Sequence, residues 1–290
     1  MYKLKLNGIF TALITPFIND KIDYNNFKKF VSWQLQNGVS GLVCCGTTGE
    51  GNGLTFDEKK KLLNICLEEV TEDKNVILGI NEADTKNTVM AIQQFSEAPI
   101  VMISPPSYIK PTQEGIYLHY KHIYEETGAP LIVYNIPSRN AVNIEDDTLK
   151  KILTLPNIVA VKETINDISR AYTIIPNVLL SGDDMMNLAL YTYGASGTIS
   201  VASNLVPDKM VAIYNAIINN DIKTAMDINN KLIPLYKLLS KCTNPIMIKY
   251  ALSNLKNNNF IINNILKLPM VPYNEGSIDI EQIMRNIYEI

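Results

Sequence analysis

The chain has 290 residues, of which 47% are hydrophobic and 19% charged, so it can bury one large core or two small ones. A net charge of −3 and an isoelectric point near 5.5 give no basic surface, which argues against nucleic acid as a partner and favours a small molecule. The first apolar run is short and closes at Pro16, so we expect no secretory or membrane segment and a cytoplasmic protein.

Short apolar runs recur along the first two thirds of the chain, and a helix-sized segment separates each run from the next. They lie at 9–15, 41–45, 76–80, 100–104, 131–136, 158–163, 178–182 and 197–201. The clearest intervening helix begins after Thr55, which has the spacing of a capping box with Glu58. This alternation predicts parallel strands joined by helical crossovers.

Eight strand–helix units predict a closed (β/α)8 TIM barrel, although an open doubly wound sheet would give the same local pattern. Two observations favour the barrel. No glycine-rich dinucleotide turn follows the first strand, and polar residues gather after several different strands. From Pro207 to Ile290 the pattern is helical. We therefore predict a barrel core over 1–206 and a C-terminal helical extension over 207–290 that completes and flanks the barrel.

The cysteines and histidines have no metal-binding spacing. Cys44 and Cys45 are adjacent in a predicted strand and are interpreted as buried core thiols. His119 and His122 lie three residues apart on a predicted helix with no acidic or cysteine ligands nearby, so we expect a surface or capping role. No metal site is predicted.

The stretch "NIVAVKET", residues 157–164, ends a buried-looking strand with Lys162. A strand that simply reaches the surface would explain a single lysine. In a barrel, however, the carboxyl ends of the strands surround the active site, so Lys162 would point into the mouth. Burial lowers the pKa of a lysine and frees its amine to form a Schiff base, while an anion anchor or a salt bridge remains an alternative.

Two further segments follow predicted strands. In "YNIPSR", Tyr134 lies one strand before Lys162 and could pass protons to a carbinolamine, and Arg139 suits a bidentate grip on a carboxylate. In "CGTTGEG", residues 45–51, glycines and threonine hydroxyls could form an anion cradle. Taken singly, these segments are more typical of a buried tyrosine, a surface arginine and a turn than of a functional site. Asp183 and Asp184 are expected to cap a helix.

The motifs "GTTGE", "YNIPSR", "VKET", "SGDD" and "GTISVASN", in this order and at these spacings, resemble the dihydrodipicolinate synthase and N-acetylneuraminate lyase family of class I aldolases. The resemblance runs from about Phe10 to "NPIMIKYAL" in the helical tail. It implies a (β/α)8 barrel with three C-terminal helices, usually a homotetramer of two tight dimers. It also implies a Schiff base between a lysine and pyruvate, without a metal or an organic cofactor.

The resemblance assigns four residues to catalysis. Lys162 matches the lysine that condenses with pyruvate, and Tyr134 matches the tyrosine that shuttles protons. Thr47 belongs to the same proton relay, and Tyr108 matches a tyrosine that completes the relay in the neighbouring subunit of the tight dimer.

Four more residues are assigned to substrate binding. Thr48 matches a contact to the pyruvate carboxylate, and Gly182 and Ile199 match positions that line the pyruvate pocket. Arg139 marks the synthase branch, where it binds the carboxylate of L-aspartate 4-semialdehyde. The implied reaction condenses pyruvate with this aldehyde to 4-hydroxy-tetrahydrodipicolinate, in lysine and diaminopimelate biosynthesis.

Two other functions remain open. A pyruvate-dependent aldolase of the same family could act on an aldehyde derived from a sugar acid, although such lyases generally lack an arginine at position 139 and have "GSTGE" in place of "GTTGE". A non-catalytic sensor built on the barrel would be expected to lose the lysine or the relay, and both are present here.

Regulation is the point at which this chain departs from the family pattern. Synthases inhibited by L-lysine bind it at the tight-dimer interface through a glutamate, an asparagine and a tyrosine, and the matching positions are Asn87, Ala83 and Ser107. Glu82 or Asp84 could supply the acid if the alignment shifts by a residue. We predict an enzyme that L-lysine does not inhibit.

Overall fold

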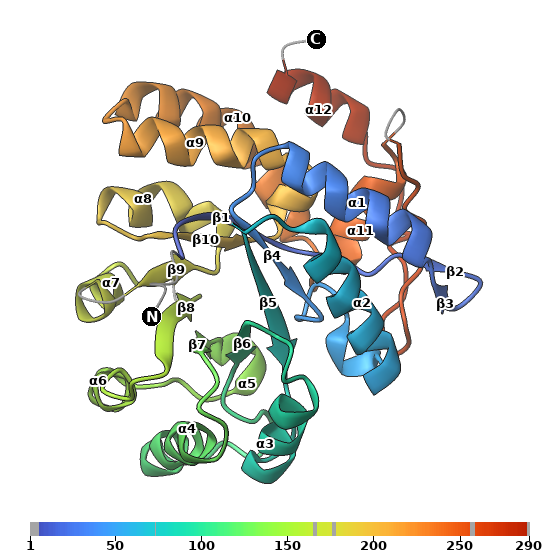
Figure 1. Cartoon of the computed structure of the whole chain (residues 1–290). Helices are drawn as coiled ribbons and strands as arrows, with labels where there is room; N and C mark the ends of the chain where they lie inside the picture. The colour runs from blue at the N-terminus through green and yellow to red at the C-terminus, as the bar shows by residue number, and fades with distance from the viewer. Residues whose placement is uncertain (1–5, 73, 165–166, 176–177, 256–258, 289–290) are drawn as a thin grey trace.

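Eight parallel strands close into a barrel in the order β1-β10-β9-β8-β7-β6-β5-β4, and β4 pairs with β1 (Figure 1). The computed structural model describes residues 6–72, 74–164, 167–175, 178–255 and 259–288. The barrel strands are β1 (Gly8–Ala12), β4 (Gly41–Cys44), β5 (Asn75–Ile80), β6 (Ile100–Ile103), β7 (Leu131–Asn135), β8 (Ile158–Glu163), β9 (Leu179–Ser181) and β10 (Gly197–Ser200). All eight predicted strands are confirmed, and closure of the sheet excludes the doubly wound alternative.

The helices lie around the outside of the strands (Figure 1). They are α1 (Tyr24–Gln36), α2 (Phe56–Glu69), α3 (Thr85–Gln94), α4 (Gln113–Thr127), α5 (Pro137–Asn140), α6 (Asp146–Ile152), α7 (Ser169–Ile174), α8 (Asn187–Thr192), α9 (Pro207–Ile218), α10 (Ile222–Leu239), α11 (Ile246–Ser253) and α12 (Ile280–Tyr288). The capping box of α2 is confirmed, because Thr55 Oγ1 accepts from Glu58 N at 3.2 Å and Glu58 Oε2 accepts from Thr55 N at 2.8 Å. No helix in the described ranges is long and apolar enough to cross a bilayer.

The first strand is shorter than predicted. The apolar run 9–15 suggested a single strand, but β1 ends at Ala12 and the chain turns away toward Pro16. The backbone N–H of Ile14 donates to the side chain of Asn204 at 3.1 Å, which replaces a strand partner. A two-stranded ribbon that the sequence did not predict follows, formed by β2 (Phe17–Ile18) and β3 (Lys21–Ile22).

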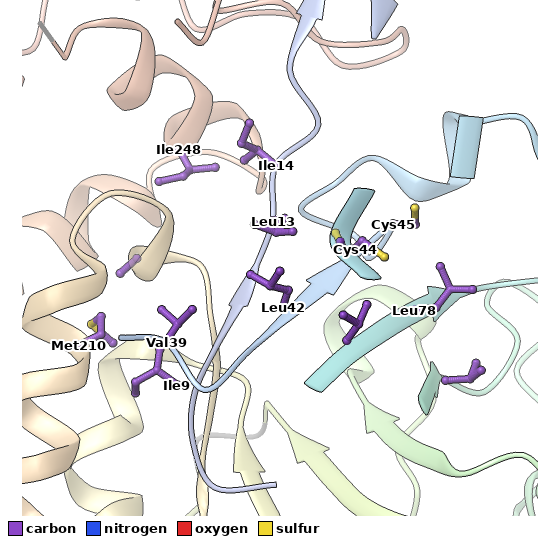
Figure 2. Packing of buried hydrophobic residues seen from close by; sticks show 14 of the residues in the cluster. Ile9, Leu13, Ile14, Val39, Leu42, Cys44, Cys45, Leu78, Met210 and Ile248 are labelled. Atoms are coloured by element: carbon purple, nitrogen blue, oxygen red, sulfur yellow. The ribbon is translucent and has the colours of Figure 1, made fainter. Parts of the chain in front are cut away.

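Alternation along each strand divides the core into two layers. Inward residues such as Phe10, Ile132 and Ala160 fill the barrel, and their outward neighbours pack under the helices. Figure 2 shows part of the outer layer, in which Ile9 lies near Met210 of α9 and which also includes Leu42 of β4 and Leu78 of β5. Cys44 and Cys45 are buried there, as predicted.

The C-terminal helices pack on one another and reach back to the barrel. Helix α9 follows β10 and packs on β1 and α10, and α10 also packs on α12 (Figure 1). No described residue after 206 lies in a strand, as expected. The division at residue 206 into a barrel core and a C-terminal helical extension remains a prediction. Helix α9, the first helix of that extension, packs on β1 and occupies the place of the eighth barrel helix.

One histidine lies where the sequence did not predict it. His119 of α4 is buried against α3, and its Nδ1 lies 2.9 Å from Thr85 Oγ1. Burial lowers the pKa of His119 to about 4, so the ring is neutral near pH 7. The expected surface role is therefore wrong for His119.

Candidate active site

Lys162 lies on the inward face of β8, two residues after Ala160 of the barrel interior. Only 7% of the residue is exposed, and Nζ lies 4.1 Å from the centre of the Tyr134 ring. Burial lowers the pKa of Lys162 to about 7; the nearby Asp184 carboxylate opposes this shift and Arg139 adds to it. A substantial fraction of this amine is therefore neutral and nucleophilic near pH 7.

Gly182, directly after β9, leaves the space that the lysine side chain occupies. A Cβ at position 182 would lie 3.0 Å from Lys162 Cε and 2.6 Å from Thr164 Cγ2. Any other residue would therefore displace the lysine or the neighbouring strand end. This contact supports the expected place of Gly182 in the pocket.

Tyr134 is the direct neighbour of Lys162 across the sheet, since β7 and β8 pair in that register. The ring faces inward with Ile132 and is buried. Burial raises the pKa of the Tyr134 phenol, while Arg139 and a hydrogen bond with the Thr47 side chain act in the opposite direction. The phenol stays protonated near neutral pH and can donate to an oxygen held beside Lys162.

The loop 46–51 presents Thr47 and Thr48 beside this pair. Its turn is closed by the backbone N–H groups of Gly49 and Gly51, which both donate to Gly46 O. A Cβ on Gly51 would overlap Cys45 O, at 1.8 Å. This glycine is therefore required by the packing of the loop, whereas the sequence suggested close approach of a ligand.

A buried ion pair holds the same loop from the C-terminal side. Lys249 of α11 is fully buried and contacts Glu50 Oε1, and its Nζ also donates to Ile265 O at 2.9 Å. The other carboxylate oxygen of Glu50 accepts from Lys267 N at 2.8 Å. Sequence reasoning missed this pair, although a lysine within the apolar segment "NPIMIKYAL" was a usable signal.

A second buried network fixes the strand ends from outside the barrel. Glu163, which follows Lys162 and points outward, accepts from Arg170 at 3.1 Å and from Asn135 at 3.0 Å. Asn135 directly follows Tyr134 on β7, as Glu163 directly follows Lys162 on β8, and it also points outward. The network therefore holds the register in which Tyr134 and Lys162 meet, and no sequence pattern predicted it.

The two aspartates after β9 have different roles. Asp183 accepts from Met185 N at 2.9 Å and caps a short 3-10 turn, as predicted. Asp184 does not cap it. Its Oδ2 accepts from the backbone N–H groups of Val201 and Ala202, at 2.9 and 2.7 Å, and so ties the end of β9 to the end of β10. The capping expectation is wrong for Asp184, whose pKa is raised by burial.

These side chains border a cleft with two adjoining cavities, of about 470 and 910 Å³. The smaller cavity is lined by Lys162, Thr48 and Gly182, among others. The larger one includes Tyr108. Five residues line both: Thr47, Tyr134, Ile136, Arg139 and Asn244. Seven of the eight predicted site residues thus meet at one cleft.

Ile199 is the exception. It is buried inside the barrel and lines neither cavity, whereas Val201, two residues later, lines the smaller one.

Arg139 is exposed in α5, and its guanidinium donates to Asn244 O at 3.0 Å. Tyr108 is 93% exposed, with a backbone φ of 72° in the left-handed region. A large exposed aromatic in a strained backbone is typical of a functional position.

Metal-binding side chains do not gather here: within the described ranges, no three His, Cys, Asp or Glu residues lie close enough to hold an ion. The cleft instead combines a partly neutral amine, a protonated phenol, two threonine hydroxyls and one guanidinium. Such a set can form an imine with a carbonyl compound and hold a carboxylate beside it.

Comparison with known proteins gives a consistent result. Residues 5–286 match the model of the Dihydrodipicolinate synthetase family. A curated 4-hydroxy-tetrahydrodipicolinate synthase of Fervidobacterium nodosum is 39% identical over 289 residues, which cover 97% of this chain and 98% of that protein. The synthase of Ehrlichia canis is 36% identical over 299 residues, covering 99% of each chain.

The solved structures agree. Dihydrodipicolinate synthase of Thermotoga maritima superposes with a TM-score of 0.91 at 35% identity, covering 99% of this chain and 98% of that one. A structure described as the first monomeric dihydrodipicolinate synthase variant gives a TM-score of 0.90 at 35% identity, covering 98% and 96%. With the barrel, the buried lysine and these matches in place, the chain belongs to the dihydrodipicolinate synthetase family.

Proposed function

We propose that this chain condenses pyruvate with L-aspartate 4-semialdehyde to 4-hydroxy-tetrahydrodipicolinate, a step of lysine and diaminopimelate biosynthesis. The observation that carries the proposal is the buried Lys162 amine, its pKa lowered to about 7 by burial, at the wall of a cavity that Tyr134 and Thr47 share. Relatives with the synthase name match almost the whole chain.

The reaction begins when the neutral Lys162 amine attacks the ketone carbon of pyruvate. The resulting carbinolamine loses water and becomes an imine, and loss of a methyl proton gives an enamine. The enamine carbon attacks the aldehyde carbon of the second substrate and forms the new C–C bond. The amino group of that substrate then adds to the imine carbon, and Lys162 leaves as the free amine.

Proton transfers are assigned to Tyr134, Thr47 and Tyr108. Tyr134 lies beside Lys162 and its protonated phenol can deliver a proton to the departing carbinolamine oxygen. Thr47 contacts the side chain of Tyr134 and carries the proton onward. No metal or organic cofactor takes part in the proposed chemistry; pyruvate itself is held as the covalent imine.

Binding roles follow the shape of the cleft. Thr48 and Gly182, which line the smaller cavity with Lys162, hold pyruvate. Arg139, which lines both cavities, receives the carboxylate of the aldehyde. Ile199 supports the pocket from within the barrel.

Assembly and location complete the proposal. Tyr108 is almost fully exposed in the single chain, which fits a side chain that reaches a neighbouring subunit, and we expect a cytoplasmic homotetramer built from two tight dimers. Mixing an inactive Lys162 variant with an inactive Tyr108 variant should restore part of the activity once subunits exchange. Full activity in a proven monomer would contradict the shared site.

The decisive test is trapping with borohydride. Pyruvate plus borohydride should leave a reduced adduct on Lys162, located by peptide mass mapping, and an unmodified Lys162 in active enzyme would exclude the Schiff base. Assay with a panel of aldehydes then separates the branches. Preference for L-aspartate 4-semialdehyde is expected, and preference for an aldehyde derived from a sugar acid would favour the alternative aldolase.

A further inference from the structure

Asn244, just before α11, connects the two halves of the cleft. Its Nδ2 donates to Thr48 Oγ1 at 2.7 Å, and its main-chain oxygen accepts from the Arg139 guanidinium at 3.0 Å. The residue lines both cavities. Thus one residue of the C-terminal segment contacts both side chains that the proposed function uses to hold carboxylates.

The side-chain bond has a direction. An amide nitrogen can only donate, so Thr48 Oγ1 accepts in this bond and keeps its own hydroxyl hydrogen for another partner. Thr48 is buried at the wall of the smaller cavity, where Lys162 also lies. The hydroxyl hydrogen is therefore available to an acceptor held in that cavity, and a carboxylate is the strongest such acceptor.

The amide also has an unfavourable feature. Asn244 Oδ1 is buried and has no hydrogen-bond partner among the described residues. A buried unpaired carbonyl oxygen destabilises a fold, so stability does not explain an asparagine at this position. The only side-chain bond that Asn244 makes within the described ranges is the one to Thr48.

From these contacts we propose that Asn244 is a positioning residue, which turns the Thr48 hydroxyl so that it donates to the carboxylate of pyruvate. The inference rests on the proposed function. It also predicts a separation of effects, because Arg139 is held by the main chain of Asn244 and not by its side chain. A change of the side chain should affect pyruvate and spare the aldehyde.

The test compares Asn244→Asp with the wild-type enzyme. The new carboxylate accepts the Thr48 hydroxyl hydrogen and places a negative charge beside the pyruvate carboxylate. Borohydride trapping of Lys162 over a pyruvate series, without aldehyde, should show the half-saturating pyruvate concentration raised roughly ten- to a hundredfold. The KM for the aldehyde at saturating pyruvate should change by less than about threefold.

Two further variants make the result specific. Asn244→Ala removes the donor without adding a charge and should raise the half-saturating pyruvate concentration by roughly three- to tenfold, which keeps the test available if the aspartate variant does not fold. Thr243→Asp is the matched control, because Thr243 is exposed, lines neither cavity and should leave pyruvate binding unchanged.

The pH dependence separates positioning from a structural role. At low pH the introduced aspartic acid is protonated and can donate to Thr48 as the amide does, so the ratio of variant to wild-type half-saturation should fall. An unchanged pyruvate half-saturation in Asn244→Asp, or an equal rise in both KM values, would overturn the inference and leave the imine intact. Absence of trapping in the wild-type enzyme would overturn the proposed function, and this inference with it.

Discussion

Two buried lysines in this chain differ in how the ammonium is placed in the core. Both ammonium groups lie 4.1 Å from the centre of an aromatic ring, that of Phe17 for Lys249 and that of Tyr134 for Lys162, but Lys249 also contacts the carboxylate of Glu50. For each lysine, burial is the main cause of a lowered pKa. The arrangement of Lys249 holds a loop in place. The arrangement of Lys162 keeps its amine reactive. Desolvation of this amine is unfavourable and should be measurable as a lower free energy of unfolding.

Replacing Lys162 by methionine should therefore stabilise the fold. The pKa of Lys162 is depressed from 10.5 to about 7, so between these values the unfolded chain binds the proton and the folded chain does not. Stability of the wild-type protein then rises with pH from about 7 to 10.5, and the full penalty is present below about pH 7. Lys162→Met should raise the free energy of unfolding by roughly 3–5 kcal/mol at pH 6.5.

Urea unfolding of wild type and Lys162→Met at pH 6.5 and at pH 10 checks this expectation. The difference in the free energy of unfolding should shrink strongly at the higher pH. An equal difference at both values would mean that packing of the methionine, and not the charge of the lysine, causes the gain.

Arg139 should distinguish the two substrates. Its guanidinium is exposed and lines both cavities, and the proposed role is to hold the carboxylate of the aldehyde. Arg139→Ala should lose a charge-assisted contact of roughly 1.5–3 kcal/mol, which weakens use of the aldehyde about ten- to a hundredfold. Steady-state kinetics with each substrate varied would show it. Equal loss for pyruvate would indicate that Arg139 acts by holding the loop through Asn244 O.

At the scale of elements, the loop after β4 and helix α11 act as one unit because of the Glu50–Lys249 pair. Removing Lys249 alone leaves a carboxylate buried without its partner, so Lys249→Met should destabilise the fold by roughly 3–5 kcal/mol and weaken pyruvate binding. The double variant Lys249→Met with Glu50→Gln should recover much of the stability.

Lys267 supplies the matched control for that variant. Its side chain is more exposed and lies 3.3 Å from Glu58, and its bond to Glu50 uses the main chain, which a substitution retains. Lys267→Met should change the free energy of unfolding by about 1 kcal/mol or less in the same urea series. Similar losses for Lys249→Met and Lys267→Met would refute a special role for the buried pair.

The elements themselves could be predicted from the sequence, because they depend on local pattern. Each barrel strand appears at a predicted apolar run, and the cap of α2 is made by Thr55 and Glu58 as their spacing indicated. The first strand was predicted to extend to residue 15 but ends at Ala12, because the distant Asn204 takes the place of a strand partner.

The site could be predicted only in part. Residues at strand ends, such as Lys162 and Tyr134, were accessible because the fold class places them at one mouth. The side chains that hold them were not, since Glu50 and Lys249 lie 199 positions apart and Thr48 and Asn244 lie 196 apart. A periodic pattern carries no information about which distant polar groups meet.

At the scale of the whole molecule, the residues that stabilise the fold and the residues of the candidate active site lie at different levels of the barrel. Along β8 the inward residue Ala160 packs in the apolar interior, and the next inward residue, Lys162, reaches the cleft. The same change occurs along β7 between Ile132 and Tyr134. Substitutions at the cleft should therefore change activity with modest effects on folding, apart from those that remove or unpair a buried charge, such as Lys162→Met and Lys249→Met.

The larger cavity should not bind L-lysine. Ala83 and Ser107 line it and lack the amide and the ring that lysine-inhibited synthases use, while Asn87 lacks the carboxylate. Neither Asp84 nor Glu82, the two alternative acids, is well placed to pair with the ammonium group of L-lysine. Asp84 caps α3 and accepts from Asn87 at 2.8 and 2.6 Å, and Glu82 lies 4.0 Å from the Lys59 ammonium.

Loss of a charged contact of about 1.5–3 kcal/mol would by itself weaken inhibition ten- to a hundredfold, and here the amide and the aromatic ring are missing as well. Lys59 also lines the cavity, and its positive charge repels a second ammonium. Titration of activity with L-lysine at subsaturating pyruvate should therefore show no inhibition at ordinary concentrations. Half-inhibition below about 1 mM L-lysine, an affinity near −4 kcal/mol, would contradict this prediction. If Glu82→Gln then abolished the inhibition, Glu82 would be identified as the acid that binds the ammonium group of L-lysine.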